Sequence, residues 1–272
     1  MTAIARALSR ATQQLSATSD TPRLDAELLM AHALGIERDA LLLSRQDAAV
    51  PEDFSGFVDR RHNGEPVAYI TGKRAFWNIE LEVGPGVLVP RPDSETLIVA
   101  AIEHFSGSQR PRRILDLGTG PGTLLLAALD QWPAATGVGV DSSPVALEFA
   151  RRNAQRLGLA PRAHFRRGDR AKGISEQFDL VLINPPYVAD DADLGPGVAD
   201  FEPAEALFAG ADGLDEYRRL SPQVARLIAP GGMAAIEIGH DQADAVGEIL
   251  SAEGYRPRLV HDLAGRPRAM LI

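Results

Sequence analysis

The chain of 272 residues has no cysteine, which excludes disulfide bonds, zinc sites built on cysteine and a thiol nucleophile. Its six histidines are scattered, and none lies at the spacing of a metal-binding set, so we expect no metal site. The sequence also lacks an apolar stretch long enough to span a bilayer and the apolar segment of a signal peptide. These absences favour a cytoplasmic protein that has no membrane partner.

The chain has fewer basic residues than acidic ones, with 28 Lys and Arg against 37 Asp and Glu. The formal net charge is -9 at pH 7 and the isoelectric point is near 5.2. Sequence-independent binding to nucleic acid requires a basic surface, so we expect no direct nucleic-acid partner. The densest basic cluster is interpreted as solvated helix and strand surface, and it comprises Arg151, Arg152, Arg162, Arg166 and Arg167.

The start of the chain predicts a small helical domain over residues 1–65, with no evident chemistry of its own. Apolar side chains recur at helical spacing at Ile4, Leu8, Ala11 and Leu15. A second helix is expected to begin at Thr21-Pro22 and to end at Gly35. We expect this domain to recognise a partner or to place the substrate.

Residues 66–90 change to a β-rich composition. The segments Val67–Thr71 and Phe76–Val83 have the pattern of two strands, with Gly72 in the turn region between them. They predict a β-hairpin that links the helical domain to the rest of the chain.

Residues 91–272 predict an α/β domain, because from Arg113 onwards apolar strands alternate with helical segments. The strands are expected near 113–117, 136–140, 163–167, 178–183 and 233–238. The helices are expected near 123–131, 143–157, 214–228 and 241–253. This alternation is typical of a doubly wound, Rossmann-like sheet. The long irregular segment 188–212 is of a length that usually has a function.

The first strand of this domain runs into a glycine-rich turn, Asp116–Gly122, in which Gly118, Gly120 and Gly122 let a ligand approach the backbone. Dinucleotide sites use G-x-G-x-x-G to bind a pyrophosphate, whereas this turn is G-x-G-x-G with Asp116 just before it. A carboxylate there suits a cationic ligand better than a phosphate, and S-adenosylmethionine carries a sulfonium and an ammonium group. The alternative for Asp116 is a carboxylate that caps the following helix.

Two more carboxylates follow the next strands. Asp141 ends the second strand, where nucleotide-binding α/β folds hold ribose hydroxyls. Asp169 follows the third strand and should lie on the same rim, where it can accept a hydrogen bond from an adenine amino group. The alternative for Asp169 is a simple surface turn.

The fourth strand stops at Asn184-Pro185-Pro186-Tyr187. Two prolines forbid its continuation and hold the backbone rigidly. The side-chain oxygen of Asn184 and the carbonyl of Pro185 can accept two hydrogen bonds from one planar NH2 group, on which the Tyr187 ring can stack. Facing a methyl donor, these acceptors would hold an amide or base amine in a near-attack geometry. The alternatives are an ordinary turn and, for Tyr187, a ring packed under the long loop.

Several motifs together resemble the peptide chain release factor glutamine N5-methyltransferases, the PrmC/HemK family. The matching segments are GEPVAYITG at 64–72, FW at 76–77, LVPRPDSET at 88–96, ILDLGTG at 114–120, NPPY at 184–187, FEP at 201–203, EIG at 237–239 and DLAGR at 262–266. The match runs almost end to end, and its combined motifs are highly specific.

The resemblance implies a class I methyltransferase fold, S-adenosylmethionine as cofactor, and transfer of a methyl group to the glutamine of the Gly-Gly-Gln loop in bacterial class I release factors. We expect a monomer. Carried over residue by residue, the cofactor would contact Asp116, Gly118, Thr119, Gly120, Gly122, Asp141, Asp169, Arg170 and Asn184. Asn184, Pro185 and Tyr187 would be catalytic, and the glutamine would lie against Asn184, Pro185, Pro186, Tyr187, Phe76, Trp77 and Arg91.

This chain departs from the family at Arg170, where many members have an aromatic residue. A guanidinium also stacks on an adenine face but prefers a wetter setting. Other interpretations stay open for the peripheral residues. Phe76 and Trp77 would also fit an interdomain core, and Arg91-Pro92 would also fit the start of a helix. Two other functions remain: methylation of a nucleic-acid base amine, and a non-catalytic module that binds the cofactor and a partner.

Overall fold

A computed structural model describes residues 2–43, 48–107, 110–195 and 197–272. They fall into two compact units. One consists of Met1–Lys73 and Asp193–Glu202, and the other of Arg74–Ala192 and Pro203–Ile272. Within the described ranges, no helix has the length and apolar character needed to cross a membrane.

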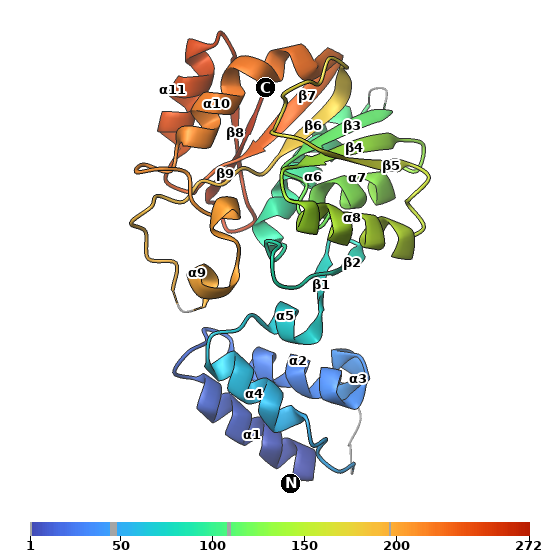
Figure 1. The fold of residues 1–272 in the computed structure, drawn as a ribbon, viewed down its shortest axis with the longest axis vertical. Helices are drawn as coiled ribbons and strands as arrows, with labels where there is room; N and C mark the ends of the chain where they lie inside the picture. The colour runs from blue at the N-terminus through green and yellow to red at the C-terminus, as the bar shows by residue number, and fades with distance from the viewer. Residues whose placement is uncertain (1, 44–47, 108–109, 196) are drawn as a thin grey trace. The chain divides into compact units, whose positions relative to one another are not determined.

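The smaller unit is helical (Figure 1). Its helices are α1 (Ala3–Leu15), α2 (Pro22–Leu34), α3 (Arg38–Leu43), α4 (Phe54–His62), α5 (Val67–Thr71) and the short α9 (Val198–Phe201). The predicted limits of the second helix are confirmed, because Pro22 occupies its first turn and Gly35 ends it in the left-handed conformation at φ 66°. Apolar faces of α1, α2 and α4 form the core of this unit, as the spacing of Ile4 and Leu8 predicted.

The prediction of a strand over Val67–Thr71 is wrong, because this segment is the helix α5. A short apolar run does not distinguish a strand from one buried helical turn. Its flanking residues decide: the Pro66 carbonyl accepts hydrogen bonds from the amides of Tyr69 and Ile70 at 2.9 and 3.1 Å. Gly72 then ends the turn at φ 74°. A hairpin does follow, formed by β1 (Lys73–Phe76) and β2 (Ile79–Glu82).

The larger unit contains a seven-stranded sheet of order β5-β4-β3-β6-β7-β9-β8 (Figure 1). The strands are β3 (Arg113–Leu117), β4 (Thr136–Asp141), β5 (Ala163–Arg167), β6 (Phe178–Ile183), β7 (Ile228–Glu237), β8 (Arg258–His261) and β9 (Pro267–Leu271). The first five in this order are parallel, whereas β9 runs antiparallel to both of its neighbours. The predicted doubly wound sheet is confirmed, and β8 and β9 add two strands that the sequence pattern did not indicate.

Helices cover both faces of this sheet. They are α6 (Glu95–Phe105), α7 (Thr123–Gln131), α8 (Pro144–Arg156), α10 (Asp215–Val224) and α11 (Ala243–Ala252), with 3-10 turns η1 (Pro92–Ser94), η2 (Ala204–Ala206) and η3 (Ala225–Leu227). In Figure 1, α10 and α11 lie across the sheet from α7 and α8. The start of a helix at Arg91-Pro92, left open above, is confirmed because Pro92 opens η1, which continues into α6.

The register of the central strands brings distant parts of the chain to one edge of the sheet. Leu117 of β3 pairs with Val140 of β4 on one side and with Ile183 of β6 on the other. The residues that follow these strands therefore meet at the same level. This is also where the strand order reverses, the place at which open α/β sheets bind ligands.

Asn153 of α8 connects this edge to the hairpin. Its side chain is fully buried, accepts from the Glu82 amide at 2.7 Å, and donates to the carbonyls of Glu82 and Pro121 at 3.0 and 2.9 Å. One amide side chain thus satisfies backbone groups of both β2 and the glycine-rich turn.

We predict that Asn153→Ala lowers the free energy of unfolding by about 2–3 kcal/mol, because buried backbone groups lose their partners. Urea unfolding followed by circular dichroism measures this change. The control is Asn63→Ala at an exposed position, for which less than about 0.5 kcal/mol is expected. Equal effects of the two substitutions would contradict the role of Asn153.

Candidate active site

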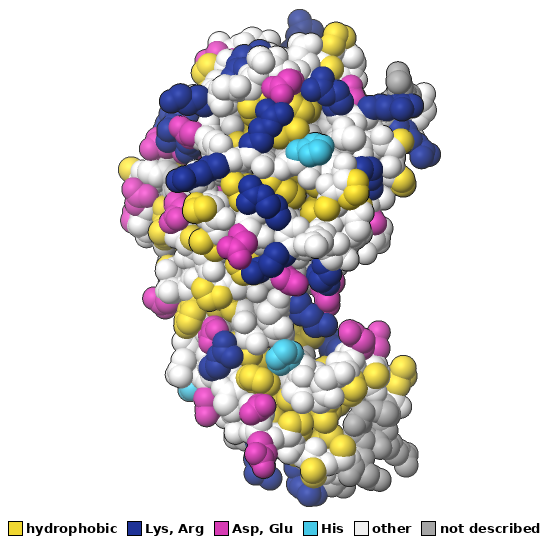
Figure 2. Space-filling model, turned by 45° about the vertical axis from the view of Figure 1, so that its right-hand side comes forward, with side chains coloured by type: hydrophobic (Ala, Val, Ile, Leu, Met, Phe, Trp, Pro, Cys, Tyr) yellow, Lys and Arg dark blue, Asp and Glu magenta, His cyan; other side chains and the backbone are white. Residues whose placement is uncertain are grey.

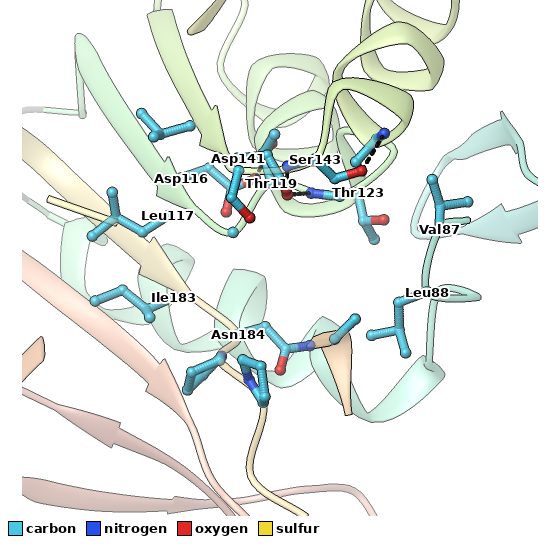
Figure 3. A pocket seen from close by; sticks show the side chains of 18 of the residues that line it. Val87, Leu88, Asp116, Leu117, Thr119, Thr123, Asp141, Ser143, Ile183 and Asn184 are labelled. Atoms are coloured by element: carbon cyan, nitrogen blue, oxygen red, sulfur yellow. Dashed lines mark hydrogen bonds between the residues drawn. The ribbon is translucent and has the colours of Figure 1, made fainter. Parts of the chain in front are cut away.

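A cleft opens at the carboxyl ends of β3, β4 and β6. It encloses about 1170 Å³ of empty space including its open mouth. Figure 3 shows Asp116, Thr119 and Asp141 on one wall, Asn184 on the opposite wall, and Val87 and Leu88 at the side. Among the residues that the structure describes, no group of His, Asp and Glu could hold a metal ion.

The glycine-rich turn forms one wall of the cleft, and Gly118, Thr119 and Gly120 all line it. The amides of Gly118 and Thr119 donate to the Val140 carbonyl at 2.9 and 3.0 Å, which folds the turn back over β4. Gly118 and Gly120 have φ of 76° and 55°, which side-chain-bearing residues rarely adopt. The predicted Gly122 is not among the lining residues; a Cβ there would lie 2.7 Å from Leu126, so its glycine shapes the turn.

Asp116 lies beneath this turn and is 1% exposed. Its Oδ2 accepts hydrogen bonds from the Thr119 hydroxyl at 2.6 Å and from the Leu125 amide at 3.1 Å. The capping interpretation is therefore correct, since Leu125 is in the first turn of α7. Its Oδ1, however, has no partner among the described residues. Burial raises the pKa of Asp116 to about 7, although the bonds from Thr119 and Leu125 oppose this rise.

Asp141 also lines the cleft, and its carboxylate is fixed by backbone amides. Oδ2 accepts from Gly120 at 2.8 Å and Oδ1 accepts from Ser143 at 2.9 Å. Burial raises its pKa, and these hydrogen bonds counteract the rise. Because a carboxylate has about four lone-pair positions, Asp141 keeps acceptor capacity for ligand hydroxyl groups.

The rim beyond β5 contains Asp169 and Arg170, both of which line the cleft. Arg170 has a positive φ of 52°, and its guanidinium contacts the carboxylates of Asp169 and Glu216. Glu216 of α10 is buried, lines the cleft and also pairs with Arg219. Arg170 is therefore held on the wall by two carboxylates rather than extended into solvent.

Asn184, Pro185 and Pro186 line the cleft, and Figure 3 shows Asn184 on the wall opposite Asp116. The Asn184 Nδ2 atom donates to the Ser94 hydroxyl at 3.1 Å. The other end of the amide, Oδ1, is thereby left as an acceptor. Gly118 lies close by, because a Cβ on Gly118 would be 3.7 Å from the Asn184 carbonyl.

The remaining predicted residues do not all line the cleft. Arg91 lines the cleft, whereas Phe76, Trp77 and Tyr187 are not among its lining residues. Phe76 is 2% exposed, and the Trp77 amide donates to Glu95 at 2.8 Å. The Tyr187 ring packs against the core, and its hydroxyl contacts Glu237 Oε1 at 3.3 Å. This placement agrees with the packing interpretation of Tyr187, and its stacking on a substrate stays a prediction.

Several residues of the cleft escaped sequence reasoning. They include Leu88, Ser94, Ser143, Glu205 and Glu216. Ser94 lies in the segment LVPRPDSET at 88–96, so its place in that motif was the available signal. For Ser143 the signal was its place two residues after Asp141 and just before a helix that begins with proline. Glu205 and Glu216 carry no local signal, because only the fold brings them to the rim.

Solved structures resemble this fold. A methyltransferase from Pyrococcus furiosus has a TM-score of 0.54 at 16% identity, covering 80% of this chain and 97% of that one. A ribosomal protein L11 methylase from Lactobacillus delbrueckii subsp. bulgaricus has a TM-score of 0.51 at 19% identity, covering 70% and 83%. At such identities the likeness concerns the fold, and that fold is the doubly wound sheet of methyltransferases.

Sequence comparisons define the family. A model of the PrmC N-terminal domain matches residues 6–72, and one of the methyltransferase small domain matches 92–201. A relative from Rhodospirillum rubrum, named release factor glutamine methyltransferase, is 44% identical over 98% of this chain and 84% of its own length. Relatives of the same name from Moorella thermoacetica and Mycolicibacterium smegmatis are 38% and 39% identical, each over 98% of this chain and 96% of the relative. The chain belongs to the release factor glutamine methyltransferase family, as its motifs predicted.

The raised pKa of Asp116 predicts a pH dependence of stability. Its folded-state pKa of about 7 lies above its usual value of 3.8. Between these two values the folded protein holds a proton that the unfolded chain has released, and this proton stabilises the folded state. The stabilisation is fully present below pH 3.8 and is lost as the pH rises through about 7. We predict that Asp116→Asn reduces the fall in unfolding free energy between about pH 5 and 8 by on the order of 2 kcal/mol.

Urea unfolding of the ligand-free protein across this range measures the effect. Burial likewise raises the pKa of Glu237 to about 7, so Glu237 also lowers the free energy of unfolding as the pH rises. Asp116→Asn should therefore remove only part of the total decrease. The exposed Asp130 provides the control, Asp130→Asn, which should keep the wild-type dependence. The same dependence in Asp116→Asn as in the wild type would refute the assignment.

Proposed function

We propose that this protein transfers the methyl group of S-adenosylmethionine to the side-chain amide nitrogen, N5, of the glutamine in the Gly-Gly-Gln loop of bacterial class I release factors. The observation that carries this proposal is the placement of Asn184 and Pro185 beside the glycine-rich turn, with Asn184 Oδ1 left as an acceptor. Family membership supplies the substrate class. We propose that the reaction takes place in the cytoplasm and modulates translation termination.

The residues of the cleft fit the cofactor. The unpartnered, buried Oδ1 of Asp116 supplies negative charge next to the turn and suits a cation. Gly118 and Gly120 would bring the backbone close to the ligand, with Thr119 between them, and Asp141 would accept from ribose hydroxyls. Asp169 and Arg170 would border the adenine. When bound, S-adenosylmethionine supplies an electrophilic methyl group on a positively charged sulfur.

Asn184 and Pro185 would act on the acceptor amide. Asn184 Oδ1 and the Pro185 carbonyl accept hydrogen bonds from the NH2 group of the glutamine and fix its plane. As the nitrogen forms its bond to the methyl carbon, the carbon–sulfur bond breaks and positive charge grows on the nitrogen. The two oxygens stabilise that charge more strongly than the neutral amide. One N–H proton then leaves to solvent, so no strong base is required.

Both parts of the chain would take part in recognition. We propose that the helical domain, residues 1–65, binds the release factor, that residues 66–90 link it to the catalytic domain, and that residues 91–272 perform the transfer. Arg91, with Phe76, Trp77, Pro186 and Tyr187, would border the entering loop. We propose that the protein acts as a monomer.

Surface charge supports a protein substrate rather than a polyanion. On the face in Figure 2, Lys and Arg side chains are interspersed with acidic, hydrophobic and uncharged residues and form no continuous stripe. Two of the five members of the basic cluster form ion pairs: Arg152 pairs with Glu82 and Glu148, and Arg166 pairs with Glu176. Nucleic-acid binding needs a continuous basic surface.

Incubation of the purified protein with S-adenosylmethionine and an unmethylated release factor tests the function. We expect one methyl group on the Gly-Gly-Gln glutamine, located by peptide mass spectrometry. Asn184→Ala should lower kcat by about 10²-fold or more, because one of two acceptors is lost. Thermal unfolding of the variant controls for its fold.

Three results would overturn parts of this proposal. Unchanged activity in Asn184→Ala would refute the mechanism. Methylation of an adenine- or cytosine-containing oligonucleotide instead of the release factor would refute the substrate. Cofactor binding with no methylated product of either kind would indicate the non-catalytic module.

The site also predicts that cofactor binding releases a proton. A cation near Asp116 lowers its pKa, so a group with a pKa of about 7 should lose about 0.5 proton at pH 7. Titration calorimetry in two buffers of different ionisation enthalpy counts the protons. Asp116→Asn should abolish this share of the release, whereas Asp130→Asn should not. Equal proton counts for wild type and Asp116→Asn would exclude Asp116 as the partner of the cation.

A further inference from the structure

A chain of polar groups leads from the cleft into the core of the larger unit. Asn184 Nδ2 donates to Ser94 Oγ at 3.1 Å. The Ser94 hydroxyl in turn lies close enough to the Glu237 carboxyl to stabilise its charged form by hydrogen bonding. Ser94 is 2% exposed and Glu237 is fully buried at the end of β7. Residues of η1 and β7 and the residue that follows β6 therefore meet through this chain.

The chemistry of the chain gives it a direction. In its ionised form the Glu237 carboxylate only accepts hydrogen bonds, so the hydrogen of the neighbouring Ser94 hydroxyl would then point to it. The Ser94 oxygen is then an acceptor for its other neighbour and selects the NH2 end of the Asn184 amide. If the amide were rotated by half a turn, Oδ1 would face Ser94 and would compete with Glu237 for one hydrogen. The rotated amide would also present a donor to the cleft.

We propose that Ser94 and Glu237 are positioning residues that orient the Asn184 side chain with its oxygen toward the acceptor nitrogen. This inference rests on the proposed function, in which Asn184 Oδ1 accepts from the NH2 group of the substrate. Neither residue touches the reacting atoms in this scheme. They ensure that Asn184 offers an acceptor and not a second donor.

The surroundings of Glu237 help to keep it an acceptor. Its Oε1 receives the Tyr187 hydroxyl at 3.3 Å, and its backbone carbonyl receives the Tyr217 hydroxyl at 3.0 Å. Burial raises its pKa to about 7, and Ser94, the positive charge of Arg268 on β9 and Tyr187 oppose the rise, whereas Asp93 adds to it. Oε2 has no partner within hydrogen-bonding geometry among the described residues. This oxygen is therefore open to the hydroxyl of Ser94, which neighbours the carboxyl.

Nuclear magnetic resonance can read the orientation of the amide without any substrate. The chain has only four asparagines, at 63, 78, 153 and 184, so labelling asparagine alone with 15N gives four side-chain amide pairs. Asn153 is fully buried, whereas Asn63 and Asn78 are exposed, and they serve as internal standards. Asn184→Ala identifies the signal of Asn184.

We expect the Asn184 side-chain hydrogens of the full-length protein to exchange with solvent more slowly than those of Asn63 and Asn78, because Ser94 holds one of them. Ser94→Ala should bring the Asn184 exchange rate to that of the exposed pair and leave Asn153 unchanged. Rapid exchange of Asn184 in the wild type would overturn the proposal. If Ser94→Ala does not fold, Glu237→Gln provides the second variant. An unchanged exchange rate of Asn184 in that variant would equally contradict the orientation of Asn184 by Ser94 and Glu237.

Kinetics with the release factor then separate positioning from a merely structural effect. Ser94→Ala should lower kcat by about 10²-fold through misorientation, with KM for the release factor and Kd for the cofactor within about two-fold of the wild type. Ser94→Thr, which keeps the hydroxyl, should restore most of the activity. Ser221→Ala removes a serine that is equally buried, at 2% exposure, and should have wild-type activity. A kcat of Ser94→Ala near that of the wild type would refute the positioning role.

A double-mutant cycle tests the orientation itself. In Asn184→Asp both side-chain oxygens are acceptors, so rotation no longer matters. Ser94→Ala should therefore cost less than about three-fold in that background, against about 10²-fold in the wild type. Equal losses in both backgrounds would overturn the proposal. A wild-type protein that methylates no release factor would refute the proposed function. The exchange rates would still show whether Ser94 holds the side-chain amide of Asn184.

Discussion

The parallel pairing of β3 with β4 and β6 is the constraint on which the rest of the site depends. Because β3 has a neighbour on each side, the ends of three strands reach one level, and the chain must leave them in different directions. Gly118, Asp141 and Asn184 are consequently adjacent although they span much of the larger unit in sequence. A shift of one residue in either pairing would turn every side chain of β3 to the opposite face and would take Asp116 away from Thr119 and Leu125, so packing and these hydrogen bonds fix the register.

Two opposite electrostatic requirements meet in this cleft. On one wall, Asp116 is a buried carboxylate and Asp141 is a partly buried one, and both cost free energy until a cation or hydroxyl groups approach. On the other wall, Asn184 and Pro185 supply neutral oxygens, which in the proposed reaction would stabilise charge without repelling an approaching amide. A charged base at Asn184 would bind a cation in the ground state, whereas neutral acceptors favour the charge that grows during transfer.

The parts of the site that the sequence predicted are those that lie at the ends of buried strands. Asp116, Asp141 and Asn184 each follow an apolar run, and the switch-point rule needs no further information to group them. Ser94 and Glu237 are different, because 90 and 53 residues separate them from Asn184 and only tertiary packing reveals their contact. The short segment Val67–Thr71 was misassigned because its apolar pattern fits two structures and its flanking Pro66 and Gly72 decide between them. The strand β8 was missed because only two of its four residues, Leu259 and Val260, are apolar, and β9 was missed because Arg268 interrupts its apolar pattern.

The position of β9 links the edge of the sheet to the cleft. This strand lies between β7 and β8 although it follows both in sequence, and β8 pairs with no other strand in the described sheet. β9 also carries Arg268, a buried cation whose positive charge favours the charged form of Glu237. A substitution that loosens β9 would therefore act in two places. It would detach β8 from the sheet, and it would remove a positive charge from the interior behind Asn184.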